Sequence, residues 1–187
     1  MIGVYIHIPY CRTICPYCDF VKRPTKGAVP AEFIRALTTE IASFDGPREA
    51  DTVFFGGGTP SLIAPRDLET VLHAVRDRFS LTSDCELTLE ANPDDITGDL
   101  VRAWIDLGVN RVSLGVQSFN EDALRYLGRR HDADGARRAC EIIGSKLPNW
   151  NIDLIFGVLP YDAWPATLEE TARMNSPHVS AYGLTYE

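Results

Sequence analysis

Residues 1–20 read MIGVYIHIPYCRTICPYCDF, a run rich in β-branched and aromatic residues that leads directly into three cysteines. The run over residues 1–8 is typical of a strand. Cys11, Cys15 and Cys18 follow in one loop, at Cys-x3-Cys-x2-Cys spacing. The segment therefore predicts a strand whose carboxyl end carries thiol chemistry.

The rest of the chain alternates strand-like and helix-like segments. Further strands are expected at 51–55, 85–90, 111–116, 151–156 and 178–184. Helices are expected at 31–44, from Pro65, at 100–107 (capped by Thr97 and ended by Gly108), at 121–127, at 134–143 and from Pro165. This alternation predicts an α/β fold with a parallel sheet and right-handed crossovers. Six strands fit either an open doubly wound sheet or a partial (β/α) barrel.

Composition limits the classes of function. Hydrophobic residues make up 45% of the 187 residues and charged residues 24%, as in soluble globular proteins. The net charge of -8 argues against a nucleic-acid partner, which would favour a basic protein. No apolar stretch is long enough to span a membrane, and the first ten residues do not resemble a secretory signal. We therefore expect a cytoplasmic protein with reduced thiols, in which clustered cysteines indicate metal or redox chemistry.

Unusual residues follow several of the predicted strands. The ligand site of a parallel α/β fold lies beyond the carboxyl ends of its strands. After the second strand comes GGGTP at 56–60, and the third ends in Glu90, followed by ANPDD. The fourth runs into Gln117, with Arg129 further on, and the fifth carries Asp153. Their common position predicts a single site.

The cysteine loop has two metal interpretations. Thiolates bind iron–sulfur clusters or zinc. Neither Cys85, on a strand, nor Cys140, on a helix, is placed to supply a fourth ligand, and both are interpreted as core residues. Three thiolates on a four-iron cluster leave one iron open to an exogenous molecule. The alternative is a zinc site completed by His7.

The other candidates have structural alternatives. Three consecutive glycines allow close approach of a ligand, but they also suit a tight turn. Glu90 is suited to bind ribose hydroxyls or an amine, or is simply a solvated acid. Gln117 and Arg129 also have surface interpretations. Asp153 lies between apolar residues, and because a buried carboxylate needs partners, we expect it to point into the site.

Seven segments resemble the radical S-adenosylmethionine (SAM) superfamily, and more narrowly the oxygen-independent coproporphyrinogen III oxidase family with its haem-chaperone relatives. They are YIHIPYCRTICPYCDF, FFGGGTPSLI, LTLEANPDD, RVSLGVQSFN, LGRRH, NIDLIFG and SAYGLTYE, in family order. The resemblance implies that residues 1–187 form a radical SAM core domain, a partial (β/α)6 TIM-like barrel. It also implies a chain truncated after the sixth strand, without the family's C-terminal domain.

The resemblance implies a [4Fe–4S] cluster held by Cys11, Cys15 and Cys18. SAM would chelate the open iron, and reduction would cleave it to methionine and a 5′-deoxyadenosyl radical. By matching motif positions, the implied SAM contacts are Tyr5, Tyr17, Gly57, Gly58, Thr59, Glu90 and, from the sixth-strand segment, Thr185. Gln117, Arg129 and Asp153 match positions that bind either this SAM or a second one in the oxidases.

Two features are similar to the haem-chaperone branch. The oxidases have a further cysteine two positions after the third, where this chain has Phe20, and they have an N-terminal extension. The branch binds haem and passes it to an acceptor protein, and a flavodoxin- or ferredoxin-type protein would donate electrons. The alternatives are an oxidase that decarboxylates coproporphyrinogen III, and a zinc or iron–sulfur scaffold without SAM.

Overall fold

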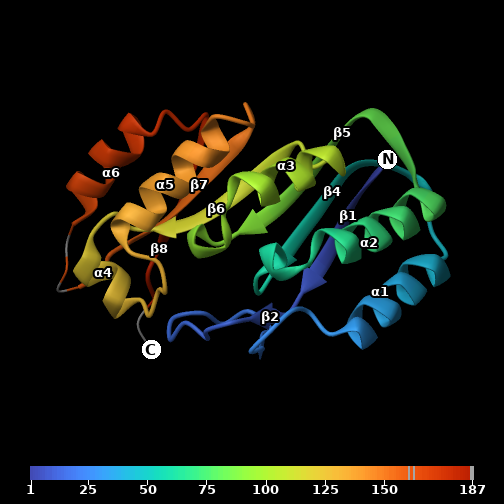
Figure 1. Cartoon of the computed structure of the whole chain (residues 1–187), viewed down its shortest axis with the longest axis horizontal. Helices are drawn as coiled ribbons and strands as arrows, with labels where there is room; N and C mark the ends of the chain where they lie inside the picture. Colours follow the sequence, from blue (N-terminus) through green and yellow to red (C-terminus); the bar gives the residue numbers. More distant parts are fainter. Residues whose placement is uncertain (160, 162, 186–187) are drawn as a thin grey trace.

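A parallel sheet forms the centre of the fold (Figure 1). The computed structural model describes residues 1–159, 161 and 163–185. The six strands of the sheet are β1 (Ile2–Ile8), β4 (Glu49–Gly57), β5 (Ser80–Ala91), β6 (Arg111–Gln117), β7 (Trp150–Phe156) and β8 (His178–Gly183). They lie in the order β1-β4-β5-β6-β7-β8, and every neighbouring pair is parallel. A doubly wound sheet would reverse its order at a switch point, so the sequential order identifies a partial barrel.

Helices connect successive strands of the sheet. They are α1 (Ala31–Ser43), α2 (Pro65–Arg78), α3 (Gly98–Asp106), α4 (Glu121–Tyr126), α5 (Ala133–Gly144) and α6 (Trp164–Arg173). Sequential right-handed crossovers place the connecting helices on one face of a sheet. Along that face α1 packs on α2, and α3 packs on α5. The opposite face of the sheet is left to line the inside of the partial barrel.

The sequence predicted the elements well, with local differences. β5 begins at Ser80, so Cys85 lies within the strand and not at its start. The Thr97 hydroxyl accepts a hydrogen bond from the Leu100 amide, and Gly108 has a φ of +98°, as expected of a cap and a helix end. Four short elements were not predicted: strands β2 (Tyr10–Cys11) and β3 (Arg23–Pro24), and 3-10 turns η1 (Pro60–Leu62) and η2 (Pro93–Asp95). The turns follow β4 and β5 directly.

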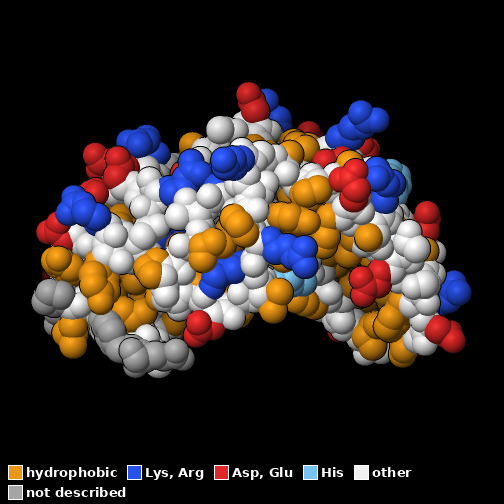
Figure 2. Space-filling view, turned by 90° about the horizontal axis from the view of Figure 1, so that it is seen from below, with side chains coloured by type: hydrophobic (Ala, Val, Ile, Leu, Met, Phe, Trp, Pro, Cys, Tyr) orange, Lys and Arg blue, Asp and Glu red, His pale blue; other side chains and the backbone are white. Residues whose placement is uncertain are grey.

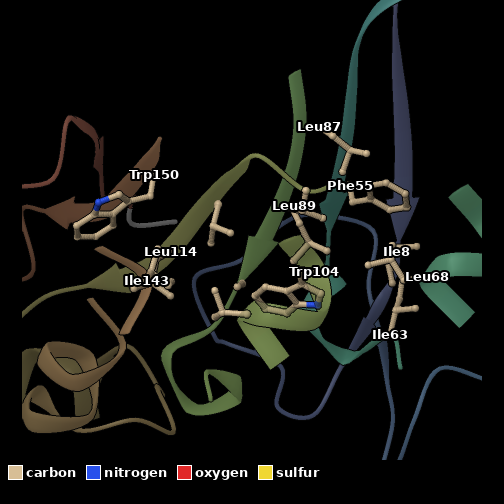
Figure 3. Packing of buried hydrophobic residues seen from close by; sticks show 14 of the residues in the cluster. Ile8, Phe55, Ile63, Leu68, Leu87, Leu89, Trp104, Leu114, Ile143 and Trp150 are labelled. Carbon is tan, nitrogen blue, oxygen red and sulfur yellow. The ribbon is translucent and has the colours of Figure 1, made fainter. Parts of the chain in front are cut away.

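The core lies between the sheet and its helices. Alternate residues of the strands point to this side, among them Ile8, Phe55 and Leu114, and they meet side chains such as Trp104 of α3 (Figure 3). All four are fully buried. Because strand side chains alternate in direction, the residues between these positions face the inside of the partial barrel.

The molecule has the shape of an arch when seen from below (Figure 2). One side of the arch is hollowed, and Lys and Arg side chains gather over its middle part. None of the helices in the described ranges is long and apolar enough to cross a membrane.

Candidate functional site at the carboxyl ends of the strands

A pocket lies where the sequence predicted a single site. It encloses about 570 Å³, part of it open to solvent. Its walls come from the cysteine loop, the loop after β4, the turn after β5 and the segment 128–130. It brings together seven of the predicted residues: Cys11, Cys15, Tyr17, Cys18, Gly58, Thr59 and Arg129.

The cysteine loop is closed at its base by backbone pairing. β2 and β3 pair in parallel, and the Thr25 amide donates to the Cys11 carbonyl at 2.9 Å. Within the loop, the Cys18 amide donates to the Cys15 carbonyl at 3.2 Å. Cys11 is buried, whereas Cys15 and Cys18 are partly exposed. Burial raises the pKa of the Cys11 thiol, and a hydrogen bond with the Thr59 side chain opposes that rise.

The glycine run allows a close approach between the end of β4 and the cysteine loop. A Cβ on Gly58 would lie 2.8 Å from the Pro9 carbonyl carbon and 2.9 Å from the Cys11 sulfur. Gly57 has a φ of +113°, and a Cβ there would lie 2.6 Å from the ring of His7. Any side chain at either position would displace the strand or the loop. The run is therefore required by packing around the cysteines and is more than a tight turn.

Glu90 supports the glycine run from the neighbouring strand. The Gly57 amide donates to Glu90 Oε2 at 3.0 Å. Burial raises the pKa of Glu90 to about 7, and the negative charge of Asp153 adds to the rise, while the Gly57 hydrogen bond opposes it. Glu90 is thus a carboxyl that titrates near neutral pH and whose other oxygen is available to a ligand's hydroxyl or amine.

Arg129 joins three parts of the site. Its Nη1 donates to Cys15 Sγ at 3.5 Å and to the Tyr17 hydroxyl at 3.3 Å. Its Nη2 donates to Asn92 Oδ1 at 2.5 Å and to the Gly115 carbonyl at 3.1 Å. Within the described part of the chain, its buried Nε has no acceptor. Arg129 also lines the pocket, so its guanidinium places positive charge where a ligand carboxylate would lie.

Asp153 lies on the inner face of β7, as expected of a partnered carboxylate. Its oxygens accept hydrogen bonds from Ser113 Oγ and Asn151 Nδ2, both at 2.7 Å. Burial raises its pKa, and these two hydrogen bonds oppose the rise. On the next strand, Gln117 has a φ of +69° where the pairing of β6 with β7 shifts register. A non-glycine residue in this region is uncommon and marks a backbone held under constraint.

Comparison with known proteins places this site in a family. The model of the radical SAM superfamily matches residues 5–172. The chain belongs to the radical SAM superfamily. Membership implies a [4Fe–4S] cluster and SAM, and three cysteines on one pocket wall beside the guanidinium of Arg129 fit both groups.

Curated relatives of this radical SAM protein carry names that agree with the narrower resemblance. The chain is 41% identical, over its full length, to the heme chaperone HemW of Escherichia coli. It is 37% identical to the mitochondrial radical S-adenosyl methionine domain-containing protein 1 of Bos taurus, over 99% of its length. It covers 51% of the first relative and 43% of the second, so it spans about half the length of the curated relatives it matches.

A solved structure supports the fold of the radical SAM protein over almost its whole length. The coproporphyrinogen III oxidase HemN of Escherichia coli superposes with a TM-score of 0.89 and 28% sequence identity. The match covers 99% of this chain and 44% of that one. The partial barrel expected from the sequence is thus confirmed by strand order and by comparison.

The zinc interpretation is not supported by the geometry of the radical SAM site. Both ring nitrogens of His7 are engaged: Nε2 with the Val21 carbonyl at 2.9 Å, and Nδ1 with the Tyr5 hydroxyl at 3.0 Å. Among the described residues, no three His, Cys, Asp or Glu side chains are grouped as around one metal ion.

Six of the predicted residues are not among those that line the pocket of the radical SAM protein: Tyr5, Gly57, Glu90, Gln117, Asp153 and Thr185. Tyr5 is on the inner face of β1, stacked on Phe54 with ring centroids 6.0 Å apart, and its side chain is 59% exposed. Thr185 follows β8, is exposed, and is not among the residues that line the pocket. The structure thus brings Tyr5 to the inner face beside Glu90. Burial raises the pKa of Tyr5, and the negative charge of Glu90 adds to the rise. Thr185 lies at the periphery.

Sequence reasoning gave no individual role to several pocket residues of the radical SAM protein. Arg12, Asn92, Asp94, Asp95 and Arg130 all line it. The sequence indicates them only by their position, because ANPDD directly follows β5 and the site of a parallel fold lies at the carboxyl ends of its strands. Their roles depend on partners far along the chain, which a local motif does not reveal.

Proposed function

We propose that the chain is the radical SAM core domain, over residues 1–187, of a haem chaperone. The observation that carries this proposal is the 41% identity to the heme chaperone HemW of Escherichia coli over the full length of the chain. Phe20, in place of the further cysteine expected of an oxidase, supports it, and its side chain is 70% exposed. In this proposal the protein binds haem and passes it to an acceptor protein.

The cluster site follows from the pocket. Cys11, Cys15 and Cys18 would hold the [4Fe–4S] cluster, and together with SAM the reduced cluster would supply reductive cleavage of the sulfonium. The glycine run, through Gly57, Gly58 and Thr59, would bind the methionyl end of SAM with backbone groups. The guanidinium of Arg129, which lines the pocket, would attract its carboxylate.

Other polar groups would orient the rest of SAM. The carboxyl of Glu90, on the inner face of the sheet, would accept a hydrogen bond from a hydroxyl or the amine of SAM. Tyr5, Tyr17, Gln117 and Asp153 complete the proposed contacts. Thr185 stays a weaker proposal because of its peripheral place.

The proposal includes partners and a compartment. A one-electron donor of the flavodoxin or ferredoxin type would reduce the cluster, and an acceptor protein would receive the haem. The five cysteines, all in described positions, are free. Free clustered thiols support a reducing compartment, and we place the protein in the cytoplasm.

A second function is favoured by one observation. The TM-score of 0.89 to the coproporphyrinogen III oxidase HemN at 28% identity supports an oxidase that converts propionates of coproporphyrinogen III to vinyl groups. The sequence similarity to chaperones is higher, and the fold is shared by both functions, so we keep the oxidase as the alternative.

One experiment separates the two functions. The anaerobically reconstituted chain is titrated with haem while the visible absorption spectrum is recorded, and a parallel sample receives coproporphyrinogen III, SAM and a reductant. A saturable haem spectrum without vinyl products supports the chaperone. Vinyl products without saturable haem binding support the oxidase and overturn the proposal. A Cys85→Ser variant, altered outside the pocket, should behave as the wild type.

A further inference from the structure

Asp95 lies in the η2 turn and makes an unusual set of contacts for an acid beside a cysteine loop. Its side chain is only 4% exposed, although it carries a carboxylate. It accepts a hydrogen bond from Ser61 Oγ at 2.7 Å, and it forms an ion pair with Arg12 Nη1. Ser61 belongs to the η1 turn after β4, so the carboxylate is fixed between two turns of the sheet edge. Buried carboxylates need such partners.

Arg12 is the residue directly after Cys11, so its contact acts on the start of the cysteine loop. Its side chain is 41% exposed, which leaves it free to move unless it is held. Asp94, the neighbour of Asp95, instead pairs with Arg130 at 3.2 Å. Consecutive acids of one turn therefore reach different walls of the pocket, and only Asp95 reaches the loop.

The loop has few other side-chain attachments between its first and last cysteine. Arg129 contacts Cys15 and Tyr17 in its middle. At its base the Arg23 and Thr25 amides are held by the backbone, with the Arg23 amide donating to the Pro9 carbonyl at 2.5 Å. The Thr59 side chain bonds with the Cys11 thiol itself, and the Arg12–Asp95 pair attaches the next residue, on the side where the loop leaves β2.

We propose that Asp95 is a positioning residue for the cysteine loop: its carboxylate, oriented by Ser61, holds Arg12 and thereby fixes the start of the loop against the turns after β4 and β5. The contact belongs to the chain without any cofactor. Its consequence for the cluster rests on the proposed function, in which Cys11, Cys15 and Cys18 are the ligands.

The first test uses the cofactor-free chain. Amide hydrogen exchange of residues 11–25 is measured by mass spectrometry for Asp95→Asn, for Arg12→Gln and for the double variant. Each single variant should speed exchange of this segment about three- to tenfold, as expected for loss of a partly exposed, charge-assisted pair. The double variant should be no faster than either single one, because both remove the same contact.

Asp94→Asn is the matched control, since it removes the adjacent acid and its pair with Arg130 but leaves Arg12 held. Its segment 11–25 should exchange at the wild-type rate. Arg12→Gln changes an exposed side chain and keeps the test valid if Asp95→Asn folds poorly. Unchanged exchange in Arg12→Gln, or equal acceleration in Asp94→Asn, overturns the proposal.

The second test reads the cluster directly. After reconstitution and reduction, the electron paramagnetic resonance spectrum of Asp95→Asn should be broader than that of Asp94→Asn, and a smaller fraction should respond to SAM. Matching spectra in the two variants overturn the role toward the cluster. If the variants exchange residues 11–25 faster than the wild type but the wild type does not bind haem, the proposed chaperone is refuted and the role of Asp95 stands.

Discussion

Glu90 accepts the amide hydrogen of Gly57 across neighbouring strands, at 3.0 Å, although the two residues are 33 positions apart in the chain. The acid thus holds the glycine run that lies against the cysteine loop. Because burial raises its pKa to about 7, its charge changes within the physiological range. Both properties can be measured on the protein without cofactors.

Replacing Glu90 by Gln should change how stability depends on pH. The folded pKa of about 7 exceeds the reference value of 4.5, so the folded state binds the proton more tightly and the wild type loses stability as pH rises from about 5 to 8. The amide oxygen of Gln can still accept the hydrogen bond from the Gly57 amide, and because Gln does not titrate, the variant does not lose stability as the pH rises. At pH 8 the variant should gain about 1–2 kcal/mol in unfolding free energy relative to the wild type, and nearly nothing at pH 5.

Urea unfolding at the two pH values measures the difference between the variants. Glu40→Gln, at an exposed position of α1, serves as the control and should follow the wild type at both. A Glu90→Gln variant whose stability runs parallel to the wild type from pH 5 to 8 would show that Glu90 does not titrate there.

Adding one methyl group at Gly58 should disturb the cysteine loop. In Gly58→Ala the new Cβ would lie within 3 Å of the Pro9 carbonyl carbon and the Cys11 sulfur, so either the loop or β4 must shift. We expect a loss of about 1–3 kcal/mol in unfolding free energy and a lower iron content after reconstitution. Gly27→Ala, where the Cβ meets nothing within 4 Å, should leave both unchanged. Equal iron content in the two variants would contradict the close approach.

Replacing Arg129 by Lys keeps the charge but removes the fork of donors. Asn92 Oδ1 and the Gly115 carbonyl would lose their donors, which should cost about 1–3 kcal/mol in unfolding free energy. SAM binding by the reconstituted protein should weaken about tenfold if Arg129 receives its carboxylate. Arg130→Lys, with 46% of its side chain exposed, should stay within about 0.5 kcal/mol. Calorimetric titration and urea unfolding give both quantities; equal behaviour of the two variants would argue against a special place for Arg129.

Removing the three loop thiols together should abolish iron binding and SAM binding in parallel. The triple variant Cys11→Ser, Cys15→Ser, Cys18→Ser is compared with Cys85→Ser, whose change lies on β5 and outside the pocket. Iron per chain and the SAM-induced change in the electron paramagnetic resonance spectrum are the measurements. Retention of iron by the triple variant would overturn the ligand assignment.

Much of the fold was predictable because its signals are local. Alternation of strand-like and helix-like segments predicted the six strands and the helices between them. Thr97 and Gly108 marked the ends of α3, because a threonine hydroxyl caps a helix start and glycine adopts a positive φ at a helix end. Strand order was open, since a doubly wound sheet and a partial barrel share the same alternation. The pairing of β4 with β5 and of β5 with β6, which makes the order sequential without a switch point, decides between them.

The candidate site was predictable where spacing or strand position carries the information, as for Cys11 and Glu90. The contact of Asp95 was not predicted, because its partner Arg12 is 83 residues away. The φ of +69° at Gln117 was also hidden, because it arises from a register shift with β7 and Gln has no preference for that conformation. Long-range partners and imposed backbone angles are properties of the assembled sheet.

The contact between Arg129 and Cys15 joins residues 114 positions apart. During synthesis, the cysteine loop therefore leaves the ribosome long before the guanidinium that later contacts it. Contacts of such high sequence separation form late, since closure of the intervening chain must come first. The thiols thus pass through a period in which they are exposed and without this neighbour, and the wall of the pocket is completed only after β6 and α4 have been made.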